Sequence, residues 1–225
     1  MIKDYKTEDA IILFSGGQDS TTCLYWAIEK FRKVSALSFT YGQKHSLEVE
    51  LAKDIAEKAG VDFTLINIDF MSTLAPNSLT NSEIVMDECK PEGSYPNTFV
   101  PARNMLFLAI ASASAFFKKA KNIVIGASEA DFSGYPDCRE EFIKSMNQTI
   151  NLALDTDITI HSPLMYLDKS QVWELSDRLG VFDIVRDNTL TCYNGIKGAG
   201  CGNCPACVLR NKGLNEFLCR KNAKR

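Results

Sequence analysis

Residues 10–24, AIILFSGGQDSTTCL, place a short apolar run directly before a turn of glycines and small polar residues. The apolar residues Ile11–Phe14 predict a buried strand, and the amphipathic segment 20–31 predicts a helix. Gly16 and Gly17 lack a Cβ atom, so the backbone between the two elements can adopt a positive φ and approach a ligand closely. The first N–H groups of the helix point into the same space, which favours a phosphate or a pyrophosphate.

The loop is neither of two common phosphate-binding motifs. No lysine follows Gly17, which excludes a Walker A loop, and the pattern G-x-G-x-x-G is absent. The motif S-G-G-x-D-S, placed after a strand, resembles the PP-loop of the N-type ATP pyrophosphatases. In that family the loop holds the β,γ-pyrophosphate of ATP while a nucleophile attacks the α-phosphorus. A turn that only caps a helix is the plainer alternative. The resemblance implies that ATP contacts Phe14, Ser15, Gly16, Gly17, Gln18, Asp19, Ser20, Thr21, Thr22, Cys23 and Leu24.

Length and composition narrow the class of protein. The 225 residues suit one domain with a small appendage, and the 45% apolar and 24% charged fractions are ordinary for a globular protein. A net charge of −3 offers no global attraction for nucleic acid, so direct binding of nucleic acid is not expected. No apolar run is long enough to span a membrane, and the charged N-terminal segment does not resemble a signal peptide. We therefore expect a cytoplasmic protein with reduced thiols.

Strand and helix patterns alternate along the chain, which predicts a parallel sheet with right-handed crossovers. The expected fold is α/β: an open, mainly parallel five-stranded sheet with helices on both faces, similar to the adenine nucleotide alpha hydrolases. The PP-loop should lie at the switch point between the first and fourth strands. Residues 70–98 are expected to form a long loop or lid. The expected strands are 11–14, 34–40, 62–68, 122–126 and 158–161, and the expected helices are 20–31, 47–59, 101–119, 139–153 and one capped by Asp168 or Ser170.

Four of the eight cysteines are grouped near the end of the chain, at Cys192, Cys201, Cys204 and Cys207. Thiolates at this C-x8-C-x2-C-x2-C spacing, on a glycine-rich turn, can converge on one tetrahedral ion. We favour a closed structural zinc site over an iron–sulfur cluster, which remains the alternative. The expected domains are residues 1–188, which bind ATP, and residues 189–225, which hold the zinc segment and a C-terminal helix. The basic tail 208–225 is interpreted as a solvated helix end, with an RNA-facing patch as the alternative.

Further segments narrow the resemblance. They are YGQKH (41–45), FVPARNMLFL (99–108), SGYPDCREEF (133–142) and LMYLDK (164–169). With the four cysteines, these segments resemble the 7-cyano-7-deazaguanine synthase family, QueC, from residue 10 to about residue 213. The resemblance implies an ATP-dependent ligase that makes a queuosine precursor. It implies that 7-carboxy-7-deazaguanine and ammonia become the nitrile through adenylated carboxylate and amide intermediates. The implied cofactors are ATP, Mg²⁺ and one structural Zn²⁺. The chain leaves no room for a glutaminase domain, so ammonia should come from solution.

The resemblance also suggests roles for single residues. Asp19 is either a Mg²⁺ or water-shell ligand or the helix N-cap. Tyr41 should lie near the adenine or the ribose. Asp137 either reads the guanine-like edge or forms a turn after Pro136. Cys138 is taken as structural, since adenylation needs no thiol nucleophile. Arginines and lysines of these segments are expected to neutralise phosphate or carboxylate charge, and the alternative role for each is a surface ion pair. The catalytic candidates are Asp19, Ser20, Arg103 and Lys169, and the substrate-binding candidates are Tyr41, Arg103, Asp137 and Arg139.

Two other functions stay open at this stage. A tRNA-thiolating enzyme shares the S-G-G-x-D-S motif and often carries C-x2-C pairs, but it needs a basic RNA-binding surface. A non-catalytic adenine-nucleotide sensor would bind ATP without releasing pyrophosphate. The sequence leaves the oligomeric state open, a homodimer included.

Overall fold

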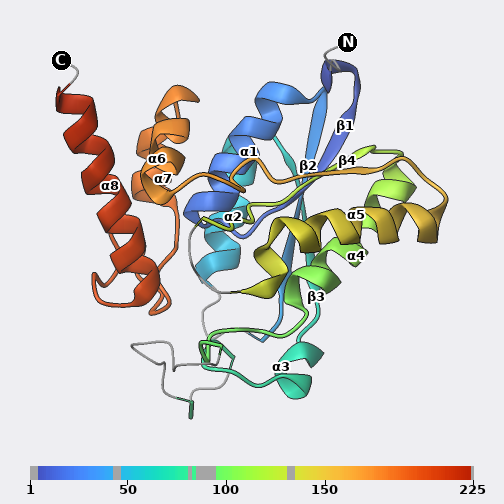
Figure 1. Ribbon diagram of the computed structural model, residues 1–225, viewed down its shortest axis with the longest axis horizontal. Helices are drawn as coiled ribbons and strands as arrows, with labels where there is room; N and C mark the ends of the chain where they lie inside the picture. Colours follow the sequence, from blue (N-terminus) through green and yellow to red (C-terminus); the bar gives the residue numbers. More distant parts are fainter. Residues whose placement is uncertain (1–4, 43–46, 81–82, 85–94, 131–134, 224–225) are drawn as a thin grey trace.

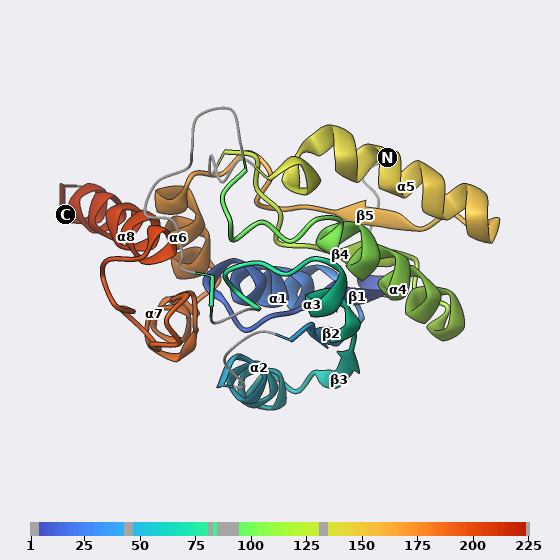
Figure 2. The ribbon, with the colours of Figure 1, turned by 90° about the horizontal axis from the view of Figure 1, so that it is seen from below.

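Apolar residues on successive positions make the first strand, β1 (Asp9–Leu13), the centre of the fold. Successive side chains of a strand point to opposite faces, so a run that is apolar throughout needs cover on both sides. The five strands of the described sheet pair in parallel (Figure 1), in the order β3-β2-β1-β4-β5 that the labels of Figure 2 follow. The computed structural model describes residues 5–42, 47–80, 83–84, 95–130 and 135–223. The other strands are β2 (Lys33–Thr40), β3 (Asp62–Asn67), β4 (Asn122–Val124) and β5 (Thr159–His161).

Helices cover both faces of this sheet (Figure 2). Ile11 and Leu13 of β1 pack in one core with buried residues of α4 and α5, and Ile12 packs in a second core with α1, α2 and α6. The sequence prediction of an open five-stranded sheet with helices on both faces is therefore confirmed. The helices are α1 (Gln18–Lys30), α2 (Leu47–Lys58), α3 (Phe70–Leu74), α4 (Arg103–Lys118), α5 (Glu140–Leu154), α6 (Lys169–Arg178), α7 (Phe182–Asn188) and α8 (Pro205–Ala223), with 3-10 turns η1 (Tyr5–Thr7) and η2 (Pro136–Cys138).

The chain reverses its direction of progress across the sheet at β1, because β2 lies on one side of it and β4 on the other. Ile12 pairs with Ala36 of β2 and with Val124 of β4. The loop after β1 therefore opens at the switch point, where the crevice between neighbouring connections leaves space for a ligand. The predicted position of the PP-loop is confirmed.

Three details differ from the sequence predictions. Helix α4 begins at Arg103, after Ala102 in the left-handed region at φ 61°, so Pro101 does not lie in its first turn. The short helix α3 interrupts the expected loop 70–98, because Met71 is buried against the sheet core. Helix α7 was not predicted, since seven residues are too few to establish a helical period. Parts of the 41–45, 70–98 and 133–142 segments, and Cys89, lie outside the described residues.

The C-terminal segment packs closely on the sheet domain. Helix α8 lies beside α6 and α7 (Figure 1), and Phe217 shares a buried cluster with Trp173 and Val185. The proposed boundary after residue 188 stays a prediction, and buried contacts cross it. Within the part of the chain that the structure describes, every helix is too short or too polar to cross a bilayer.

Candidate functional site

A cavity of about 370 Å³ opens at the carboxyl ends of β1, β2 and β4. The PP-loop forms one side of it, and the rest of the lining comes from β2, α2, α4, α6, α8, the connection after β4, the segment after α7 and the single residues Tyr41, Leu79, Tyr135 and Cys138. Gly126 follows β4, and a Cβ atom there would lie 3.3 Å from the backbone of Asp19 and Ser20. The connection after β4 therefore approaches the start of α1 closely.

The PP-loop is a tight turn held by its own hydroxyl groups. Gly16 has a φ of +75°, and a Cβ atom at this position would lie 3.0 Å from the backbone of Ala52. The hydroxyl oxygens of Ser15 and Ser20 lie 3.0 Å apart, and Ser20 donates to the Gly17 carbonyl at 3.3 Å. Gln18, Asp19 and Ser20 line the cavity, so the start of α1, where the helix dipole favours an anion, lies at this side of it.

Asp19 and Lys169 form a charged pair at the edge of the cavity. Lys169 Nζ lies 2.7 and 2.9 Å from the two carboxylate oxygens of Asp19. The Lys169 side chain is only 8% exposed, whereas Asp19 is 31% exposed. The N-cap of α1 is Gly17, so the alternative of Asp19 as the cap is wrong. The carboxylate is held by the ammonium and keeps lone pairs on its exposed side.

The N-terminal cap of helix α6 positions Lys169 at the cavity. The Asp168 carboxylate accepts from the Gln171 backbone N–H at 2.8 Å, and the Gln171 side chain accepts from the Asp168 N–H at 2.9 Å. This reciprocal capping box fixes the first turn of α6, of which Lys169 is the first residue. Of the two cap candidates, Asp168 is confirmed, and Ser170 instead donates to Asp168 at 2.6 Å.

An aromatic and cationic wall lies opposite the PP-loop. The rings of Phe39 and Phe107 stack with centroids 4.1 Å apart, and the Arg103 guanidinium lies 6.0 Å from the centroid of Tyr41. Among the described residues, the buried Nε of Arg103 has no hydrogen-bond acceptor. Burial lowers the pKa of Arg103, but Tyr41 and Asp137 outweigh it, so the pKa is raised and the charge is retained. The wall therefore offers a fixed cation and flat apolar surfaces.

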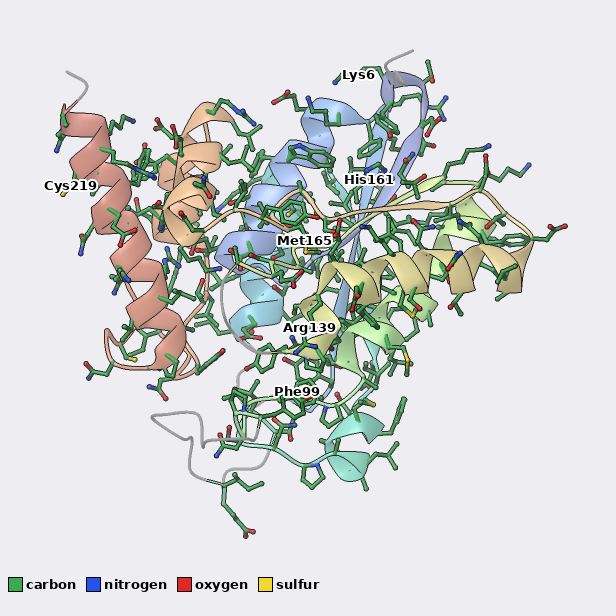
Figure 3. All side chains as sticks on the ribbon, in the orientation of Figure 1. Lys6, Phe99, Arg139, His161, Met165 and Cys219 are labelled. Atoms are coloured by element: carbon green, nitrogen blue, oxygen red, sulfur yellow. The ribbon has the colours of Figure 1, made fainter. Side chains whose placement is uncertain are left out.

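The remaining residues singled out in the sequence differ in whether they line the cavity. Asp137 is buried outside the cavity lining, where its carboxylate accepts from the Asn104 N–H at 3.1 Å and its carbonyl accepts from the Asn104 side chain at 3.1 Å. Cys138 lines the cavity, and burial together with Asp137 raises its pKa to about 11, which keeps the thiol protonated at neutral pH. Arg139 directly precedes α5 (Figure 3), and its side chain is exposed and is not part of the cavity lining.

The segment after α7 supplies cavity residues that were not predicted. Leu190, Thr191 and Tyr193 line the cavity beside the PP-loop. The Leu190 N–H donates to the Gly16 carbonyl at 3.2 Å, and the Gln18 N–H donates to Thr191 Oγ1 at 3.3 Å. The pKa of the Tyr193 hydroxyl is raised, chiefly by burial. These residues carry no local motif, and only their position beside Cys192 could have drawn attention to them.

The four cysteines converge as their spacing predicts. Their Sγ atoms all lie within 4.8 Å of one another, so this group could hold a metal ion. Tetrahedral zinc with Zn–S bonds of about 2.3 Å places its sulfurs about 3.8 Å apart, and the Sγ atoms of Cys201 and Cys207 are separated by 3.9 Å. The backbone N–H of Cys204 and the Asn194 amide both donate to Cys201 Sγ at 3.3 Å. Such donors favour thiolates, so the residues fit a thiolate-bound ion.

The open parallel sheet, the PP-loop at its switch point and the charged cavity together define a PP-loop protein with an ATP-utilising fold. Comparison with known families is more specific: the model of "Queuosine biosynthesis protein QueC" matches residues 9–218. The chain belongs to the QueC family.

Relatives of high sequence identity agree with this assignment, and a solved structure agrees with the fold. A 7-cyano-7-deazaguanine synthase from Parabacteroides distasonis is 60% identical over 96% of this chain and 97% of its own length. The synthase of the same name from Bacillus subtilis is 52% identical over 97% of this chain and 99% of its own length. The structure of NMN synthetase from Francisella tularensis is similar in fold, with a TM-score of 0.54 at 18% identity, covering 98% of this chain and 88% of that one.

Proposed function

We propose that the protein is a 7-cyano-7-deazaguanine synthase, an ATP-dependent carbon–nitrogen ligase that makes a queuosine precursor. The observation that carries the proposal is the cavity itself, which joins an anion-binding helix start, the Lys169–Asp19 pair and an aromatic wall with a buried arginine. Both curated relatives carry the synthase name over nearly their whole length, which favours this function over tRNA thiolation.

The reaction needs activation because a carboxylate is a poor electrophile. The carboxylate oxygen of 7-carboxy-7-deazaguanine attacks the α-phosphorus of ATP, forming an acyl adenylate and releasing pyrophosphate. Ammonia attacks the acyl carbon, AMP leaves, and the nitrogen loses one proton to give the amide. The amide oxygen then attacks the α-phosphorus of a second ATP, again releasing pyrophosphate. Loss of AMP and of the two remaining protons on nitrogen gives the nitrile.

The PP-loop side of the cavity suits the pyrophosphate. The loop backbone from Ser15 to Ser20 would bind the leaving pyrophosphate, and the Ser20 hydroxyl, which donates to the Gly17 carbonyl, would hold the turn in shape. The buried ammonium of Lys169 would offset negative charge that develops on the phosphates. Bound Mg²⁺ supplies further neutralisation of phosphate charge, and the exposed oxygens of Asp19 would contact its water shell.

The opposite wall suits the organic substrates. Arg103, held in the wall with an unsatisfied Nε, would bind the substrate carboxylate or the developing adenylate. Tyr41 and the stacked rings of Phe39 and Phe107 would contact the adenine or the ribose. Asp137 and Arg139 lie outside the cavity lining, so both stay candidates for substrate binding rather than assigned ligands.

The cofactor and partner proposals complete this function. Zn²⁺ would be held by Cys192, Cys201, Cys204 and Cys207 as a closed crosslink of the C-terminal segment, with no part in the chemistry. The partners would be the deazaguanine acid and free ammonia, without direct contact to nucleic acid. We further propose a cytoplasmic location and leave the homodimer as a hypothesis for a mass measurement in solution.

The test is incubation of the purified protein with MgATP and 7-carboxy-7-deazaguanine, with and without ammonium, followed by mass analysis. We expect the nitrile, AMP and pyrophosphate with ammonium, and no nitrile without it. Lys169→Met should lower turnover by about 10²-fold or more, since it removes charge stabilisation at the phosphates. Lys121→Met, in a surface ion pair with Asp157, is the matched control and should leave turnover unchanged. ADP and phosphate as the only nucleotide products would contradict the proposal.

A further inference from the structure

Residues far away in the sequence form hydrogen bonds with the start of α1. The Gln18 N–H, the first amide of that helix, donates to Thr191 Oγ1 at 3.3 Å across 173 residues. Leu190 adds a backbone bond to Gly16 at 3.2 Å. The first four N–H groups of a helix have no partner inside the helix, so an outside acceptor can set the angle at which the turn presents the others.

Thr191 is itself fixed by a buried arginine. Arg210 Nη1 donates to Thr191 Oγ1 at 3.1 Å and to Thr189 Oγ1 at 3.0 Å. Its Nη2 donates to the carbonyls of Val185 and Arg186 at 3.0 and 2.8 Å. These carbonyls belong to the last turn of α7, where the helix dipole favours a cation. Arg210 therefore links α7, α8 and the segment beside the PP-loop.

The surroundings of Arg210 show that this charge is costly to keep. Its side chain is only 1% exposed, and burial lowers its pKa. Its guanidinium stacks 5.2 Å from the centroid of Trp173, and no carboxylate pairs with it among the described residues. Four neutral oxygen atoms hold the buried guanidinium in one geometry. The planar guanidinium tolerates little displacement of these acceptors, so it is suited to fixing the residues that carry them.

The hydroxyl group of Thr191 has one hydrogen-bonding function left, its own hydrogen. An alcohol oxygen has two lone pairs and one hydrogen, and both lone pairs are taken by Gln18 N–H and Arg210. Its O–H is left as a donor, and Thr191 lines the cavity. Gln18 gives an independent indication that a ligand binds in this part of the cavity. Its side-chain amide is buried and lacks hydrogen-bond partners among the described residues.

We propose that Arg210 and Thr191 are positioning residues for nucleotide binding. Arg210 holds the Thr191 hydroxyl so that it fixes the first amide of α1 and directs its own O–H toward a ligand oxygen. This inference rests on the proposed use of ATP at the PP-loop. It adds that residues beside the cysteine segment set the affinity of the protein for the triphosphate.

The experiment compares Thr191→Val with Thr189→Val. Both threonines accept from Arg210, but only Thr191 contacts the PP-loop. We expect Thr191→Val to weaken MgATP binding in calorimetry by about tenfold, the value of one lost hydrogen bond. The KM for ATP should rise by the same factor, with kcat changed less than twofold. Thr191→Ser, which keeps the hydroxyl, should bind ATP within about twofold of the wild type, and so should Thr189→Val.

A double-mutant cycle tests the role of Arg210. If Arg210 acts through Thr191, Arg210→Lys should weaken ATP binding, and adding it to Thr191→Val should cause no further loss of affinity. Equal losses of affinity in Thr189→Val and Thr191→Val would overturn the proposal, as would wild-type affinity in Thr191→Val. Wild-type protein that binds no MgATP would instead refute the proposed function, and the positioning role with it.

Discussion

Gln18 illustrates at the scale of one residue how binding and stability conflict in this fold. It is 1% exposed and lines the cavity, and neither polar atom of its side chain has a hydrogen-bond partner among the described residues. A buried polar atom without a partner costs about 1–3 kcal/mol, so this amide destabilises the protein until a ligand contacts it. A side chain kept under such a cost is expected to have a binding role.

Gln18→Met therefore should stabilise the free protein and weaken its complex. The substitution keeps the length of the side chain and removes both unsatisfied atoms, so the free energy of unfolding should rise by about 1 kcal/mol. Affinity for MgATP should fall, because the ligand loses its partner. Denaturant unfolding and calorimetry measure the two effects. Gln148→Met, at an exposed position of α5, is the control and should change neither. A destabilised Gln18→Met protein with unchanged affinity would contradict this account.

The sequence predicted the PP-loop side of the cavity better than the opposite side. Glycines and hydroxyls next to a strand form a local pattern, so Gly16 and Ser20 could be assigned to the loop from sequence alone. Lys169 was a prediction that the geometry brings to the cavity, in a pair with Asp19. Thr191 and Arg210 could not be predicted, because their roles come from contacts over 173 and 19 residues that no local pattern encodes.

At the scale of elements, helix α6 links a cap to a site residue. Its Asp168 cap precedes Lys169 directly, so loss of the cap should fray the turn that positions the ammonium. Asp168→Ala should lower the free energy of unfolding by about 1 kcal/mol and reduce turnover, whereas Asp168→Asn, an equally good cap, should be close to the wild type. Thermal unfolding and pyrophosphate release measure the two effects. An alanine variant with normal stability would show that the capping box contributes nothing.

The same cap should show a pH dependence. Burial raises the pKa of Asp168, but hydrogen bonds from Ser170 and Gln171 outweigh it and lower the pKa overall. A carboxyl group whose pKa is lower in the folded state stabilises the protein above its unfolded pKa, and this contribution is lost as the pH falls through the folded value. The stability difference between the wild type and Asp168→Ala should therefore shrink below about pH 4.

The strands and the long helices were predictable from the sequence, and the short helices were not. The strands of the sheet and helices such as α2 and α5 match their expected ranges within about three residues, since their patterns extend over several turns or a whole buried run. Helices α3 and α7 have five and seven residues, and their place depends on burial of Met71 and Val185 in tertiary cores. The start of α4 shifted because Ala102 adopts a left-handed conformation that its sequence does not signal.

At the scale of the whole molecule, the cysteine cluster should stabilise the segment that contacts the PP-loop. Cys201→Ser should lose bound metal and lower the melting temperature by on the order of 10 °C, because metal binding and folding are coupled. Cys219→Ser, at an exposed position of α8, should change neither. Metal analysis of the purified variants and thermal unfolding measure both effects. Normal stability in a metal-free Cys201→Ser protein would exclude a structural role for the cluster, and iron in place of zinc would favour the iron–sulfur alternative.

The sequence holds one S-G-G-x-D-S motif, so both activations of the proposed reaction should take place in the cavity beside it. An amide intermediate must then be a substrate: 7-amido-7-deazaguanine with MgATP, without ammonia, should yield the nitrile with AMP and pyrophosphate. Asp19→Ala removes the carboxylate that pairs with Lys169 and that is proposed to contact the metal's water shell. It should therefore lower the turnover of both the acid-to-amide and the amide-to-nitrile step by about 10²-fold.

Single-turnover assays started from the acid and from the amide measure the two steps separately. Asp157→Ala, which breaks the surface pair with Lys121, is the matched control and should leave both rates unchanged. Because each step transfers an adenylyl group to an oxygen of the same substrate carbon, a shared site predicts parallel losses. An Asp19→Ala enzyme that loses only one step would require a second activating site, which the cavity at the PP-loop does not provide.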